Sequence, residues 1–243
     1  LYDASPDNQQ YKLEMAFSLS GLASVQRLVP IPDQALSNLQ QAYVLLNEIA
    51  EQDGNNQKRR MEAIIRAQRM MDIRFWIEPA EDLWPEANDL KDQMEAIFTQ
   101  GSSVDYESSV DYGYSLLGLS ELAWLLENKD ESERLLNQSI DWLSALVDEE
   151  PESRRSRRSF AHALFVFWER NGTLPSKEVD LILDGYLGDP EQVRSCSDAV
   201  LAARLEIMRG NKILAKHYTE YLLGKGYYES GFVAFCRRYE LCD

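Results

Sequence analysis

The sequence predicts an all-α protein, an α-solenoid of antiparallel helical hairpins with about 10–11 helices. Three observations support this fold class. Apolar residues recur at steps of three and four along most of the chain, which is the helical period. No segment alternates convincingly with the period of two that a half-buried strand shows. Turn-forming clusters separate the apolar stretches and recur about 48 residues apart.

The expected helices follow one another with short breaks. Asp33 is expected to cap the second helix, because a short acidic side chain can accept bonds from the first free N–H groups. Pro79 and Pro85 are expected to interrupt the chain before a fourth helix that ends near Thr99. The remaining helices are expected at residues 9–28, 57–77, 106–127, 131–147, 154–170, 175–186, 190–209, 211–223 and around 230–238.

The recurring turns predict one repeat-containing domain over residues 1–243. A single hairpin cannot bury its apolar face, so stacked neighbours must supply the core. Gly101, Ser102 and Ser103 suggest a sub-boundary near residues 101–104. Residues 226–243 are expected to form atypical capping helices at the C-terminus.

Two segments carry a family resemblance. Leu201, Ala202 and Leu205 lead into Gly210-Asn211 and then into Ala215. This arrangement of a first helix, a tight turn and a small residue at the helix crossing resembles the TPR repeat. The units are longer than the TPR length of about 34 residues, and the Trp-Leu-Gly-Tyr consensus does not appear in order.

A second resemblance concerns the start of the chain. The entry Pro6-Asp7-Asn8 and the following Gly21 are similar to TPR-type C-terminal regions of bacterial signalling and regulatory proteins. That group includes Ser/Thr kinases, signalling ATPases and winged-helix regulators. The resemblance implies a bacterial regulatory module. Because residue 1 is Leu rather than Met, we interpret the sequence as a processed chain or an excised domain.

The charge excludes several partner classes. The chain has 41 acidic and 25 basic residues, a net charge of −16. Nucleic acids and anionic membranes attract basic surfaces, so neither is expected as a partner. No apolar run approaches the roughly 20 residues of a membrane span, so no transmembrane segment is expected. The oligomeric state is left open.

No residue pattern predicts catalysis, a metal or a cofactor. The two histidines, His162 and His217, are far apart in the sequence, and no phosphate-binding glycine motif occurs. Three reduced, partly buried thiols are the favoured interpretation of the cysteines, with a cytoplasmic location. A disulfide between Cys196 and Cys236 or Cys242 would instead indicate the periplasm.

The candidate partner-binding residues come from local clusters of cations and aromatic residues. Basic side chains crowd two expected first helices, the helices that line the concave face of a TPR-like solenoid. An acidic peptide or a phosphate would suit such a groove, whereas pairing with neighbouring carboxylates is the competing interpretation. The candidates are Arg59, Arg66, Arg69, Arg154, Arg155, Arg158 and the aromatic Trp168.

The leading hypothesis is a non-enzymatic scaffold that binds a protein or peptide in a groove. Two alternatives stay open. One is a helical domain of a larger bacterial signalling protein that senses a small molecule between its hairpins. The other is an all-α enzyme that uses dispersed carboxylates.

Overall fold

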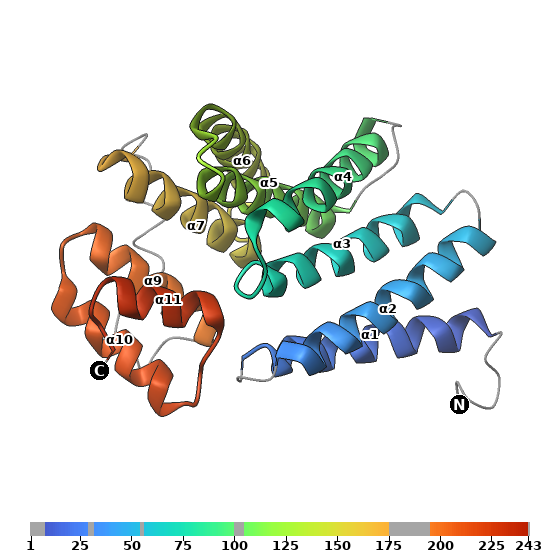
Figure 1. Ribbon diagram of the computed structural model, residues 1–243, viewed down its shortest axis with the longest axis horizontal. Helices are drawn as coiled ribbons and strands as arrows, with labels where there is room; N and C mark the ends of the chain where they lie inside the picture. The colour runs from blue at the N-terminus through green and yellow to red at the C-terminus, as the bar shows by residue number, and fades with distance from the viewer. Residues whose placement is uncertain (1–7, 29–31, 54–55, 100–104, 175–194, 243) are drawn as a thin grey trace. The chain divides into compact units, whose positions relative to one another are not determined.

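The computed structural model describes residues 8–28, 32–53, 56–99, 105–174 and 195–242. These residues form ten helices and no strand, which confirms the all-α prediction (Figure 1). The helices are α1 (Gln9–Gln26), α2 (Pro32–Gln52), α3 (Gln57–Arg74), α4 (Ala80–Thr99), α5 (Tyr106–Leu125), α6 (Lys129–Glu149), α7 (Arg154–Asn171), α9 (Cys196–Met208), α10 (Lys212–Gly224) and α11 (Ser230–Arg238).

The chain divides into two compact units, an N-terminal unit (Leu1–Leu135) and a C-terminal unit (Leu136–Asp243). The division falls within α6. Each unit is described by itself.

In the N-terminal unit, α1 and α2 form an antiparallel hairpin, and α3 packs beside α2 (Figure 1). Gln9 at the start of α1 bonds to Gln52 at the end of α2, and Gln26 bonds to Gln34 at the opposite end. The core between these helices centres on small residues that let the backbones approach closely. Its fully or nearly buried members are Ala16, Ala42, Leu45, Leu46 and Ala63.

Further along this unit, α5 meets the start of α6 through two serines. The Ser120 hydroxyl donates to the Ser132 carbonyl at 2.8 Å, and the Ser132 hydroxyl donates to the Ser120 carbonyl at 2.8 Å. Both side chains are fully buried. This reciprocal pair satisfies two buried hydroxyls where the helices cross closely.

Pro85 corrects one sequence expectation. It lies inside α4 rather than ahead of it. A proline there removes one helical hydrogen bond, to the carbonyl of Glu81, and crowds the same turn. Burial of Leu83 and Leu90 on either side of Pro85 favours the continuous helix despite that cost.

In the C-terminal unit, α9 and α10 form a hairpin around the predicted tight turn. Gly210 has φ of +77°, a conformation that a side chain would disfavour, and the Asn211 side chain accepts a bond from the Leu214 N–H to cap α10. Ala215, Tyr218 and Leu222 on α10 are fully buried. The end of α7 is also as expected, with Gly172 at φ of +70°.

The start of α9 differs from the expected one. Ser195 is extended and caps α9, with its hydroxyl accepting a bond from the Asp198 N–H at 3.1 Å. The helix therefore begins at Cys196, and the predicted start at Pro190 lies outside the described residues. The helix expected at 175–186 lies outside them as well.

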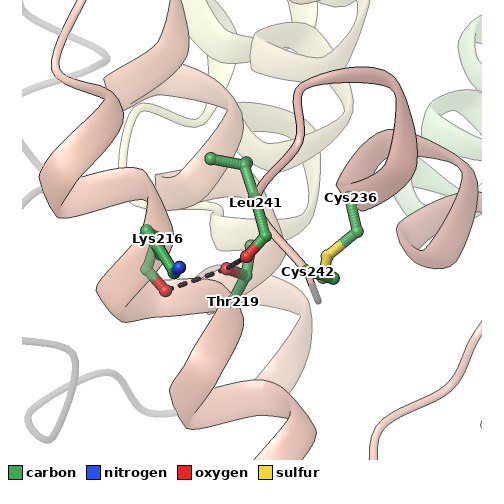
Figure 2. The surroundings of a disulfide bond; sticks show 5 residues. All are labelled: Lys216, Thr219, Cys236, Leu241 and Cys242. Atoms are coloured by element: carbon green, nitrogen blue, oxygen red, sulfur yellow. Dashed lines mark hydrogen bonds between the residues drawn. A yellow bond between two sulfur atoms is a disulfide. The ribbon is translucent and has the colours of Figure 1, made fainter.

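The chain after α11 folds back onto α10. Glu240 has φ of +54°, which reverses the direction of the chain, and the Leu241 carbonyl accepts a bond from the Thr219 hydroxyl at 3.2 Å. This reversal brings Cys242 back to Cys236, with Cα atoms 5.3 Å apart, and the two form a disulfide (Figure 2). The expectation of three reduced thiols was therefore wrong for this pair, and Cys196 is the free cysteine of the described region.

The odd-numbered helices begin at regular intervals. They start at Gln9, Gln57, Tyr106, Arg154 and Cys196, which are 48, 49, 48 and 42 residues apart. These intervals match the spacing of the turn clusters in the sequence.

Candidate functional site

The arginines of α3 mostly interact within the N-terminal unit. Arg59 pairs with Glu62 at 2.6 Å. Arg66 is only 7% exposed, donates from Nε to the Ser20 hydroxyl at 2.7 Å, and lies over the ring of Phe17. A guanidinium buried in this way holds α3 against α1, so we remove Arg66 from the candidate partner surface.

The other cations of α3 follow the same trend. Arg74 bonds to Glu78 at 2.8 Å and to Glu86 at 2.7 Å. The bond from Arg74 lowers the pKa of Glu78, against a smaller opposing effect of burial. Arg69 is half-buried and has interactions of its own. Pairing with neighbours therefore accounts for much of the α3 cluster.

The arginines at the start of α7, in the C-terminal unit, lie in a different environment. Arg154 is exposed and approaches Asp198 on α9 at 4.0 Å, and Arg155 is half-buried. Arg158 is also half-buried, and its side chain makes no hydrogen bond or ion pair. The first turn of α7 contains no acidic residue, and the Ser153 side chain does not cap it. The positive end of the helix dipole therefore adds to the positive charge of these side chains.

Five residues of α7 form one face of the helix. Arg155, Arg158, His162, Phe165 and Glu169 follow one another at steps of three and four, so their side chains lie along one side. We call this set the α7 stripe. It changes from basic to aromatic to acidic along the helix.

Arg204 on α9 packs against the aromatic part of the α7 stripe. Its guanidinium carbon lies 5.5 Å from the ring centroid of Phe165 and 5.8 Å from that of Phe235 on α11. The two rings contact each other edge to face, with centroids 5.8 Å apart. Tyr239 completes the group, at 5.2 Å from Phe235 and 6.3 Å from Phe165. Each cation–ring contact contributes about 0.5–2 kcal/mol, depending on desolvation.

Arg204 has no anionic partner among the residues that the structure describes. Its Nε is buried and makes no hydrogen bond, whereas its two Nη atoms are neither bonded nor fully buried. A buried unpaired donor costs about 1–3 kcal/mol. The guanidinium is therefore held by rings at its back and is open to solvent at its Nη edge.

The carboxylate of the α7 stripe is already engaged. Glu169 accepts a bond from the Tyr239 hydroxyl at 2.6 Å and pairs with Arg238 at 3.2 Å. Burial, and then the bond to the Glu169 carboxylate, raise the pKa of Tyr239 above its usual value of 10.0. The phenol therefore stays protonated at neutral pH and keeps donating to Glu169.

The imidazole of the α7 stripe is neutral at pH 7. Burial, followed by the nearby positive charge of Arg204, lowers the pKa of His162 well below its ordinary value of 6.5. The positive charge of this cluster therefore comes from the arginines alone. Trp168, the aromatic candidate from the sequence, is half-buried, and its ring centroid is 6.0 Å from that of Phe165.

Arg204, Tyr239 and Glu169 were not among the sequence candidates. Arg204 stands alone within an apolar helix, so no run of basic residues marks it. Its importance depends on Phe235, which is 31 residues further along the chain. Only the packing of α11 against α7 reveals the group.

No set of three or more His, Cys, Asp or Glu side chains that could hold a metal occurs within the described ranges. No described helix is both long and apolar enough to cross a membrane. Comparison with protein-family models, with curated proteins and with solved structures finds no match to this chain. The described chain is thus an all-helical protein whose most distinctive charged group is the Arg204 cluster.

Proposed function

We propose that this chain is a TPR-like helical-repeat module that binds an acidic peptide of a partner protein along the α7 stripe. The observation that carries the proposal is the presence of two guanidiniums, Arg158 and Arg204, without a carboxylate partner in a chain of net charge −16. Acidic side chains outnumber basic ones, so pairing would be expected for nearly every arginine. An external anion is the simplest partner for the two that lack one.

The helix arrangement supports the same proposal. Arg154 meets Asp198 near the N-terminal ends of α7 and α9, and Phe165 meets Arg204 further along both helices. The two helices therefore run in the same general direction, as successive first helices of a solenoid do. The near-constant spacing of the odd-numbered helices supports a repeat of this kind.

The stripe also has the composition of a recognition surface. Arginine and aromatic residues are enriched at the centres of protein interfaces, where they contribute most of the binding energy. Arg158 and Phe165 are seven residues apart, so they lie about 10 Å apart along the helix axis. That length matches a short peptide segment rather than a single small ion.

Reversal of charge at Arg155 and Arg158 tests the proposal. The probe is a fluorescein-labelled peptide of alternating glutamate and glycine, followed by fluorescence anisotropy. The Arg155→Glu, Arg158→Glu variant is expected to bind at least about tenfold more weakly, and raised salt should weaken binding by the wild type. Arg60→Glu on α3 is a matched control with the same change of charge per site.

A peptide of alternating lysine and glycine should not bind. Equal affinity of the double variant and the wild type for the glutamate peptide would overturn the α7 stripe as the binding face. Absence of any binding by the wild type would overturn the proposed function itself.

A further inference from the structure

We infer that Arg204 is a preformed receptor for one acidic side chain, an aspartate or a glutamate, of the bound peptide. This inference rests on the proposed function and names the specific contact within it. The argument uses the aromatic support of the guanidinium, its unpaired donors, and the charge around it.

The aromatic support fixes the orientation of Arg204. Phe165 and Phe235 lie within 6 Å of its guanidinium carbon and come from two different helices, α7 and α11. The two phenyl rings also pack on each other and on Tyr239. A guanidinium held against these rings loses little conformational freedom when an anion binds, which favours binding.

The unpaired donors determine what fits. The buried Nε already lacks a partner, so the guanidinium makes no hydrogen bond to the described protein. The Nη edge contacts solvent and presents N–H donors in one plane. A carboxylate can accept two parallel bonds from such a planar edge.

The surrounding charge selects a singly charged anion. His162 is adjacent but uncharged, and Arg238 is paired with Glu169 at 3.2 Å. Arg204 therefore supplies one unit of positive charge at this position. One carboxylate neutralises it, whereas a doubly charged phosphate would require a second free cation nearby. Arg158, two turns earlier on the α7 stripe, is placed to contact a different residue of the same peptide.

The competing carboxylates of the protein are engaged elsewhere. Glu169 is held by Tyr239 and Arg238, and Asp198 accepts a bond from the Ser195 hydroxyl at 2.8 Å. Neither lies within ion-pair distance of Arg204. The protein therefore does not block this position with its own acidic side chains in the described region.

The test compares two substitutions of Arg204 with the full-length chain and the same labelled glutamate peptide. Arg204→Met keeps an unbranched side chain between the rings but removes the charge and the donors. It is expected to weaken binding about ten- to hundredfold. Arg204→Lys keeps the charge but loses the planar donor pair, and an intermediate loss is expected. Unfolding curves from circular dichroism must show that both variants are folded, and Arg60→Met serves as a control of the same type.

Three peptides distinguish the possible sources of the anion. All have an amidated C-terminus, and they carry glutamate, glutamine or phosphoserine at the variable positions. The inference predicts binding of the glutamate peptide, no binding of the glutamine peptide, and no gain in affinity from phosphoserine. Tighter binding of phosphoserine that depends on Arg204 would overturn the choice of a carboxylate.

Two results separate this inference from the proposed function. If Arg204→Met binds the glutamate peptide as the wild type does while the Arg155→Glu, Arg158→Glu variant does not, Arg204 is not the receptor and the function stands. If the amidated glutamate peptide fails but its free-acid form binds, the contact is to a chain terminus, and the assignment to an acidic side chain is wrong.

Discussion

The disulfide between Cys236 and Cys242 makes a prediction about the stability of the C-terminal unit. The two cysteines are six residues apart in the sequence, so the bond closes a short loop. Loop-closure entropy for a loop of this size gives about 2 kcal/mol of stabilisation, because the cross-link restricts the unfolded chain. Cys242→Ser should remove this amount and leave Cys236 as a buried thiol, a state that suits a small apolar side chain.

Urea unfolding under oxidising conditions measures the effect. With a typical dependence on denaturant of about 2 kcal/mol per molar, the midpoint of the variant should fall by about 1 M. Hydrogen exchange should locate the loss at α10 and α11, because Leu241 and Thr219 connect the C-terminal segment to α10 (Figure 2).

Reduction provides the control for this prediction. With dithiothreitol present, the wild type and Cys242→Ser should unfold at the same urea concentration. Equal midpoints under oxidising conditions would show that the cross-link does not stabilise the fold. A difference that persists after reduction would assign the loss to the serine side chain instead.

Three further predictions concern the two units. His162 has a lowered pKa in the folded protein, so the unfolded chain binds more protons as the pH falls below about 6.5; stability should decline there, and His162→Gln should remove that part of the decline, whereas exposed His217→Gln should not. Pro85→Ala should raise stability by about 1–2 kcal/mol in thermal or urea unfolding, because it restores the helical bond to Glu81 and loses only the entropic advantage of proline; a lower stability would show that the proline ring is needed for packing. Ser120→Val should destabilise by about 1–3 kcal/mol, because the fully buried site has no room for a methyl group and the reciprocal bonds with Ser132 are lost, whereas the exposed Ser18→Val should change stability by less than about 0.5 kcal/mol.

Most of the fold was predictable because helix ends depend on local chemistry. Gly172 and Gly210 end their helices with positive φ, and Asn211 caps the next one, as their residue types suggest. The start of α9 also had a local signal that was overlooked. Ser195 and Asp198 form the serine-to-acid spacing of a capping box, which marks a helix start better than Pro190 does.

Pro85 was misjudged because its cost is local but its compensation is not. The proline removes one hydrogen bond within α4, and that loss can be read from the sequence. The burial of Leu83 and Leu90 depends on the helices around α4, which the sequence does not specify. The disulfide was missed for a related reason, since pairing depends on the reversal of the chain at Glu240.

The site shows a more general limit of reading charge from sequence. Clusters such as Arg59 and Arg66 attract attention because several cations are adjacent, yet Glu62 and Ser20 engage these two. An isolated cation such as Arg204 attracts none. Its environment decides its role, and that environment comes from Phe235, in a helix distant in sequence.

In an acidic protein the number of arginines in a segment is therefore a weak guide to anion binding. Carboxylates are abundant, so a clustered arginine usually finds one within its own helix or the next. The informative arginine is one that packing keeps away from the protein's own carboxylates while leaving its donors in contact with solvent. Arg204 meets this condition, because Phe165 and Phe235 occupy the positions next to it where an acidic partner would otherwise lie. Replacing Phe235 with Glu should then supply an internal partner for Arg204 and abolish binding of the glutamate peptide, whereas Phe235→Leu should keep it.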